Sequence, residues 1–254
     1  MTRFDCNCFT GNWPFFKVRY NTVEKIQSLH QRIGIIGGFI SACEAIFYQD
    51  PYEAEADLAK ELEGTPYHQA MILNPTLPGW KADLKRCVET LHIKAVRLMP
   101  TYHKYSLTDP ILDEVCEAVK AYGLPLLLTL RLRDERCMYM FQPDFVNKDD
   151  LAAFLSKHKD VVTLLTDASA YELELLSSVF AERENLFADC SGLKDGLFAA
   201  DNAYRAIGDK LVYGSAAPLL EMQASFYNIT MSPLDEDVKT KILSGKEFLA
   251  FCNL

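Results

Sequence analysis

The residues with the clearest chemical potential are four arginines in the middle of the chain. Arg97 and Arg131 lie within two short apolar runs, and Arg133 and Arg136 follow the second run directly. A guanidinium group is always charged and binds a carboxylate or phosphate through two parallel hydrogen bonds. We therefore predict a site for a small anionic substrate, with Arg97, Arg131 and Arg136 among the residues that bind it.

Three further residues could transfer protons beside these arginines. His103 lies between tyrosines in the loop after one apolar run, and an imidazole has a pKa near neutrality. Asp5 and Asp134 could orient the arginines or act as acid–base groups. We predict His103, Asp5 and Asp134 as catalytic residues.

Other polar and aromatic side chains stand at the ends of the same kind of run and complete the predicted substrate site. They are Asn7, Trp13, Tyr105, Asp189 and Ser215.

Each of these residues also has a structural interpretation. Arg97 could form a buried pair with Asp5 or Asp189, and Asp189 could instead cap a helix. His103 and Trp13 could be packing residues, and the segment 134–136 could form a local salt-bridged turn.

Strand and helix patterns alternate along the whole chain. Eight short apolar runs predict buried parallel strands. They are Arg3–Phe9, Gly34–Ser41, Tyr67–Asn74, Ile93–Met99, Leu124–Leu132, Val161–Asp167, Asn185–Ser191 and Lys210–Ser215. Amphipathic segments between them predict helices, such as the one that begins at the capping box Ser169–Glu172.

Eight such repeats predict one α/β domain over residues 1–254, a single (β/α)8 TIM barrel with extra C-terminal helices from Ser232 onward. The alternative is an open doubly wound sheet, which usually carries a glycine-rich phosphate loop. The cluster from Gly34 to Gly38 lacks that spacing. In a barrel, the chemistry lies at the C-terminal ends of the strands, where the residues named above stand.

Composition narrows the class of protein further. The net charge of −9 disfavours nucleic acid as a partner, and the sequence has no apolar stretch that predicts a membrane span. Eight cysteines without a C-x-x-C pair are typical of a reduced, cytoplasmic protein. A homo-oligomer is left open.

The ordered motifs together resemble a known family. Phe4-Asp5-Cys6-Asn7, Tyr213–Pro218 and Ile242–Leu249 are similar to the first strand, the eighth strand and the C-terminal segment of the amidohydrolase-2 branch of the metal-dependent hydrolases. The resemblance implies a barrel enzyme that uses a metal centre for hydrolysis or decarboxylation of small molecules.

The usual metal ligands of that branch are missing here. Its first strand supplies two histidines where this chain has Asn7 and Phe9, and its eighth-strand aspartate is Ala216. Of the five histidines, His103 alone is expected at the site, so a three-histidine zinc centre is excluded. His103 with carboxylates could hold a harder divalent ion, but we predict no metal and no other cofactor.

Two functions remain open. The first is an amidohydrolase-like hydrolase that acts on a small carboxylated or cyclic substrate without the usual metal, with a lactone or ester as the favoured substrate and decarboxylation ranked lower. The second is a non-catalytic ligand-binding or scaffold barrel that kept the pocket and lost the chemistry.

Overall fold

A closed barrel of eight parallel strands forms the centre of the molecule. The computed structural model describes residues 2–132, 144–194, 196, 198–252 and 254, and the strands pair in chain order from β1 to β8. Their bounds are Arg3–Thr10 (β1), Ile35–Ala42 (β2), Tyr67–Leu73 (β3), Ala95–Leu98 (β4), Leu126–Thr129 (β5), Thr163–Thr166 (β6), Leu186–Asp189 (β7) and Leu211–Val212 (β8). Main-chain bonds from Cys6 to Tyr213 and from Phe9 to Ala217 close β1 onto the β8 end. The predicted barrel is confirmed.

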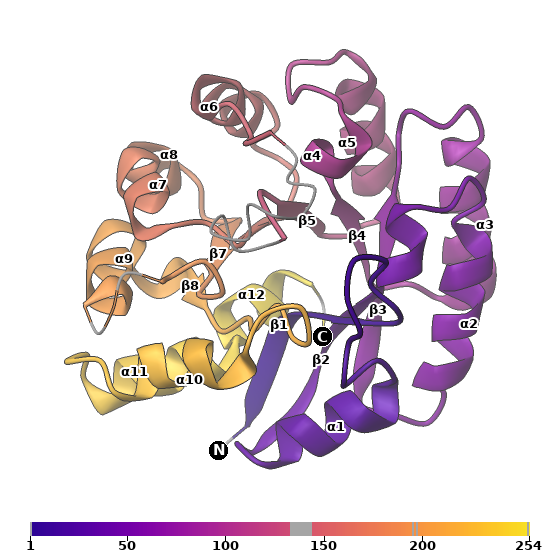
Figure 1. Cartoon of the computed structure of the whole chain (residues 1–254). Helices are drawn as coiled ribbons and strands as arrows, with labels where there is room; N and C mark the ends of the chain where they lie inside the picture. Colours follow the sequence, from indigo (N-terminus) through magenta and orange to yellow (C-terminus); the bar gives the residue numbers. More distant parts are fainter. Residues whose placement is uncertain (1, 133–143, 195, 197, 253) are drawn as a thin grey trace.

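Helices surround this barrel (Figure 1). Their bounds are Val23–Gln31 (α1), Tyr52–Leu62 (α2), Trp80–Leu91 (α3), Pro100–His103 (α4), Ile111–Ala121 (α5), Lys148–Lys157 (α6), Ala170–Leu175 (α7), Ser177–Glu182 (α8), Ala199–Ile207 (α9), Met222–Thr230 (α10), Glu236–Ser244 (α11) and Lys246–Phe251 (α12), with 3₁₀ turns at Cys43–Ile46 (η1) and Gly208–Lys210 (η2). The last two α-helices are the extra C-terminal helices that the sequence predicts. The capping box of Ser169 and Glu172 is present at the start of α7.

The barrel interior changes from apolar to polar along the strands. Near their N-terminal ends, Phe39, Leu127 and Phe187 pack in one cluster with Phe248 of α12, which closes this end. Two residues further along each strand, the inward side chains are Ser41, Thr129 and Asp189, because strand residues alternate between faces. The polar layer therefore lies toward the C-terminal ends of the strands.

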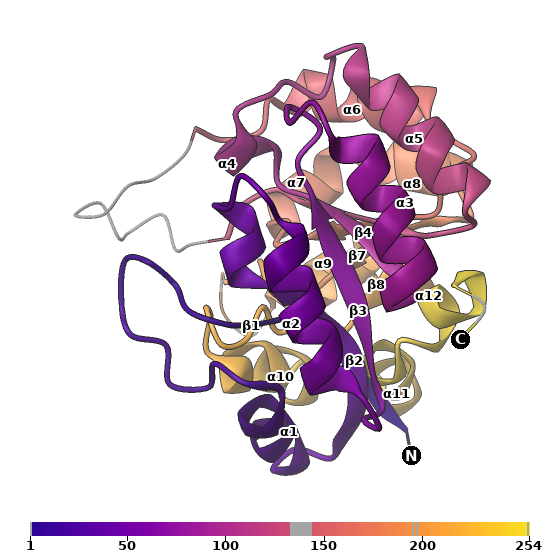
Figure 2. The same cartoon turned by 90° about the vertical axis from the view of Figure 1, so that its right-hand side faces the viewer.

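The two ends of the barrel are separated in Figure 2, where α4 and the loop after β1 lie on one side and α12 with the C-terminus lies on the other. No helix in the described part of the chain is long and apolar enough to span a membrane.

Candidate functional site

Arg97 of β4 stands in the middle of the polar layer. Its side chain is fully buried, Nε donates to Ser41 Oγ (2.8 Å) and Nη1 donates to Thr129 Oγ1 (3.1 Å). The guanidinium carbon lies 4.4 Å from the centre of the Phe9 ring, a cation–π distance. Burial lowers the pKa of Arg97 to about 10, with Asp189 opposing this shift, so Arg97 stays charged at neutral pH.

A second group of polar side chains joins β1 to β7. Asn7 Nδ2 donates to Asp189 Oδ2 (2.6 Å), and Ser191 Oγ donates to Asp189 Oδ1 (2.8 Å). Asp189 Oδ1 also accepts the main-chain N–H of Asp167 (3.0 Å). Asp189 thus ties the end of β6 to β1, and the structure brings the predicted residues Asn7, Arg97 and Asp189 to one end of the barrel.

Several polar atoms at this end have no hydrogen-bond partner among the described residues. They include Asn7 Oδ1, Arg97 Nη2 and both carboxylate oxygens of Asp167. Buried polar groups are nearly always satisfied in folded proteins, so each exception needs an explanation. A bound ligand or ordered water would supply the missing partners.

Asp5 and Ser215 do not join this group. Asp5 Oδ1 accepts the main-chain N–H of Asn7 and of Ser215, and Oδ2 accepts Ser215 Oγ (2.6 Å) and bonds His30 Nε2 (3.0 Å). His30 Nδ1 bonds Tyr67 Oη (3.0 Å). Regular alternation would place Asp5, Asn7 and Phe9 on one face of β1. The β1–β2 register shifts between Asp5 and Cys8, and Asp5 meets α1 instead.

His103 lies at the end of α4 and is buried. Its Nε2 donates to the main-chain oxygen of Ile46 (3.0 Å), and burial lowers its pKa to about 4. A neutral imidazole that holds the η1 turn is the state this geometry favours. The catalytic role of His103 stays a prediction, and this burial weighs against it.

Arg131 follows β5 and forms an ion pair with a residue of α7. Its Nη1 and Nη2 both donate to the Glu172 carboxylate, at 2.8 and 2.5 Å, and Nη1 also donates to the main-chain oxygen of Asp167 (2.8 Å). Arg131 therefore stabilises the main chain at the end of β6. Asp134 and Arg136, the other predicted residues of this loop, lie outside the described residues.

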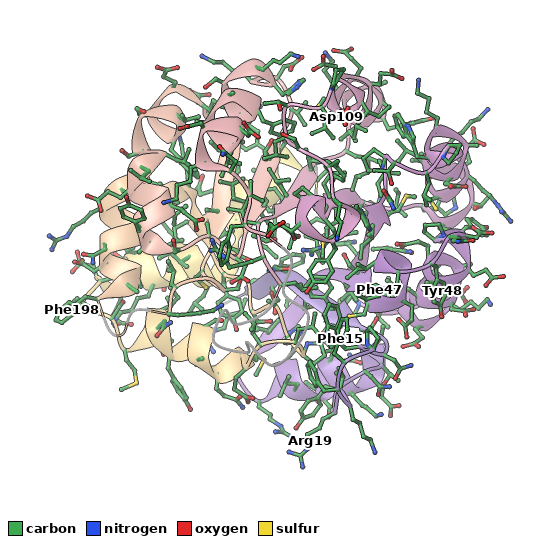
Figure 3. The ribbon with its side chains drawn as sticks, turned by 45° about the horizontal axis from the view of Figure 1, so that its top comes forward. Phe15, Arg19, Phe47, Tyr48, Asp109 and Phe198 are labelled. Carbon is green, nitrogen blue, oxygen red and sulfur yellow. The ribbon has the colours of Figure 1, made fainter. Side chains whose placement is uncertain are left out.

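The two predicted aromatic residues lie at the rim. Trp13 packs edge-on against Phe15, Phe47 and Tyr102, with ring centres 5.4 to 5.7 Å apart. Figure 3 shows Phe15 and Phe47 close to one another on one side of the molecule. Tyr105 lines a cavity of about 490 Å³ at the same end, whose wall includes Phe145. The Phe145 ring lies 5.7 Å from the Arg131 guanidinium carbon, so the cavity adjoins the end of β5.

Glu55 of α2 is a buried carboxyl group that the sequence analysis missed. Its side chain lies against β3, where Oε1 accepts the main-chain N–H of Ile72 (2.8 Å) and Oε2 accepts a hydrogen bond from Gln69 Nε2 (2.6 Å). Burial raises the pKa of Glu55 to about 7, although these two bonds and Arg97 oppose that shift. One acidic residue within an amphipathic helix is not distinctive, so the sequence did not indicate that Glu55 is buried.

Glu55→Gln is expected to flatten the pH dependence of stability. Folded Glu55 keeps its proton after the unfolded chain has released it, so the free energy of unfolding falls by about 3 kcal/mol as pH rises from about 4.5 to 7. Urea titrations at several pH values measure the slope for both proteins. Equal slopes would show that Glu55 does not titrate in this window.

The model of the family described as Amidohydrolase matches residues 38–245. The chain belongs to the amidohydrolase family. No curated protein matches the chain.

Solved structures share the barrel of this amidohydrolase at low identity. A dihydroxybenzoic acid decarboxylase from Polaromonas, with bound manganese and 2-nitroresorcinol, is 13% identical with a TM-score of 0.75, over 100% of this chain and 97% of that one. A 5-carboxyvanillate decarboxylase from Novosphingobium aromaticivorans, with manganese, is 12% identical (TM-score 0.67, 98% and 97% covered). A probable 2-pyrone-4,6-dicarboxylic acid hydrolase from Acinetobacter baumannii, with citric acid, is 12% identical (0.67, 100% of both).

These structures correct the expectation of no cofactor. Two of them were crystallised with bound manganese, so a metal cofactor is typical of such barrels. In the described part of this chain, histidine, cysteine and acidic donor atoms converge at Asp5, Cys8 and His30. These donors are already used: Asp5 and His30 bond as above, and Cys8 Sγ donates to the main-chain oxygen of Phe39 (3.2 Å). As folded, this cluster does not fit a divalent ion.

Proposed function

We propose that this member of the amidohydrolase family is an enzyme that acts on a small carboxylated molecule, with Arg97 as the group that binds the carboxylate. The observation that carries this proposal is the buried Nη2 of Arg97, which has no hydrogen-bond partner within the described residues. A carboxylate oxygen would satisfy that N–H group and neutralise the buried charge.

The surroundings of Arg97 support a polar, carboxylated substrate. Asn7 Oδ1 offers a second unsatisfied atom, an acceptor for a hydroxyl group. Each of the three solved relatives reported above is named for a carboxylated substrate. Arg97 is fully buried, so binding requires the loops at this end to move apart, and the cavity beside Tyr105 lies at the same end.

Hydrolysis of an ester or lactone is the reaction we propose. It needs water, a group that carries one proton and a fixed position for the substrate carboxylate. A non-catalytic binding barrel is the second candidate, because Phe9 and Ala216 stand where the family's ligands are expected. The two differ in one result: a binding barrel has carboxylate affinity that depends on Arg97 and forms no product.

Arg97→Met is expected to weaken carboxylate binding by about 30- to 150-fold, because a hydrogen bond to a charged group contributes about 2–3 kcal/mol. Calorimetric titration with benzoate, citrate and pyrone carboxylates measures this, with and without added manganese. Chromatography of the same mixtures detects product.

Arg183→Met is the matched control for this test. Arg183 is also buried, but it donates to the main-chain oxygens of Leu155 and Val161 at the other end of the barrel. Its replacement should lower stability and leave carboxylate affinity unchanged. If no carboxylate binds the unmodified protein, or if both variants bind equally well, the proposed function is wrong.

A further inference from the structure

Asp167 follows β6 directly and has an unusual backbone. Its φ is +61°, in the left-handed region that residues other than glycine rarely adopt, and its side chain is 1% exposed. Such strain persists only where the surrounding structure enforces it, and it is concentrated at functional sites.

Three contacts hold this backbone in place. The main-chain N–H of Asp167 donates to Asp189 Oδ1 (3.0 Å), and its main-chain oxygen accepts Arg131 Nη1 (2.8 Å). Gly192 packs so closely that a Cβ there would lie 2.5 Å from the carbonyl carbon of Asp167. The position of the carboxyl group is therefore fixed from β5, β7 and the loop after β7.

Among the described residues, the carboxyl group of Asp167 has an ion pair with Lys194 and no shorter hydrogen bond. Asp5 and Asp189, the other buried aspartates of the barrel, accept bonds at both oxygens. Neither oxygen of Asp167 has a hydrogen-bond donor in the part of the chain described here. In the described part of the chain, Lys194 forms an ion pair with it: Nζ lies 3.5 Å from Oδ1, and the lysine side chain is one-third exposed. The buried oxygens can thus accept or give a proton without first breaking a bond.

The charges around Asp167 place its titration near neutrality. Burial raises its pKa to about 7, Lys194 and Arg131 oppose this, and Asp189 adds to it. Glu172 lies behind Arg131 and pairs with it. His103 differs, because burial lowers its pKa to about 4. An acid–base group works best when its pKa is close to the working pH.

We propose that Asp167 is the proton-carrying group of this site and that Lys194 tunes its charge. This rests on the proposed function. The Asp167 carboxylate takes a proton from water as the water oxygen bonds to the ester carbonyl carbon. It returns that proton to the leaving oxygen as the carbon–oxygen bond breaks, and Asp167 ends as the carboxylate that it was at the start.

Asp167→Asn tests this with two independent measurements. Hydrolysis of 4-nitrophenyl hydrogen succinate, an ester with a free carboxylate, should fall by about 100- to 10,000-fold, with benzoate affinity unchanged. The Tm should rise by about 10 °C at pH 8, where the wild-type carboxylate is ionised when folded, and the difference should shrink as pH falls and vanish only below about pH 4, where the unfolded chain is protonated as well. Glu55→Gln replaces another buried carboxyl group of raised pKa, one that bonds β3, and should keep the hydrolysis rate.

The outcomes separate the two proposals. Hydrolysis by Asp167→Asn within threefold of wild type, or an unchanged Tm at pH 8, would overturn the role of Asp167 while benzoate binding stands. Loss of benzoate binding in the wild type contradicts the proposed function, and the Tm comparison still tests whether Asp167 is ionised when folded.

Lys194→Met tests the tuning. Removing this positive charge raises the pKa of Asp167, so the midpoint of the pH profile of kcat/KM should move upward by about one pH unit. Lys159→Met is the control. Lys159 is exposed and pairs with Glu182 instead of Asp167, so its removal should leave the midpoint of the pH profile in place. An unchanged midpoint in Lys194→Met would show that Lys194 does not act on the proton-carrying group.

Discussion

Asp5→Ala is expected to lower the free energy of unfolding by about 3–5 kcal/mol, because Asp5 is the hub of a fully buried network. Its oxygens accept the main-chain N–H of Asn7, the N–H and hydroxyl of Ser215, and the bond to His30. Alanine would leave the Asn7 N–H, the Ser215 hydroxyl and His30 Nε2 buried without their partner, each at about 1–3 kcal/mol, whereas the Ser215 N–H would keep its bond to the main-chain oxygen of Asn7. Urea denaturation followed by circular dichroism at pH 7 measures the loss.

Asp57→Ala is the control for this experiment. Asp57 is exposed on α2 and pairs with Lys60, so its removal should change stability by about 0.5 kcal/mol or less. A loss below about 1 kcal/mol in Asp5→Ala would show that the network relaxes around the missing carboxylate. It would then reopen a catalytic interpretation of Asp5, which a rigid four-bond hub disfavours.

The architecture followed from the sequence because each element carries a local signal. The apolar run at Leu124–Leu132 and the capping box at Ser169 depend on neighbouring residues alone, and the structure places β5 and α7 there. The barrel's topology also follows from strand order, since consecutive parallel strands with helical crossovers lie beside one another.

The site was harder to predict, because it depends on contacts between distant residues. Alternation along β1 placed Asp5 beside Asn7, but a register shift that no local pattern signals turned Asp5 toward His30. Arg131 had the right spacing for a ligand-binding residue, but its partner Glu172 lies 41 positions away. Asp167 is at a strand end in the sequence, but its left-handed backbone and its carboxyl oxygens without hydrogen bonds, which distinguish it from Asp189, have no local signal.

Gly192→Ala is expected to lower the free energy of unfolding by about 2–3 kcal/mol, as overpacking of a buried contact does. A Cβ at Gly192 would lie 2.3 Å from the main-chain oxygen of Ala168 and 2.5 Å from the carbonyl carbon of Asp167. Because these are main-chain atoms, no side chain can rotate aside, and the end of β6 must move. Thermal and urea denaturation measure the cost.

The same substitution separates position from chemistry at Asp167. Gly192→Ala keeps the carboxyl group but shifts the strained backbone that holds it, so ester hydrolysis should fall as well, with the midpoint of its pH profile retained. Gly79→Ala is the control, since a Cβ there would meet nothing closer than Asp83 Oδ2 at 3.6 Å. If Gly192→Ala is as stable as Gly79→Ala, the main chain at the end of β6 can shift with little loss in the free energy of unfolding. The left-handed backbone of Asp167 would then not be enforced by packing, and its placement would depend on Asp189 and Arg131 alone.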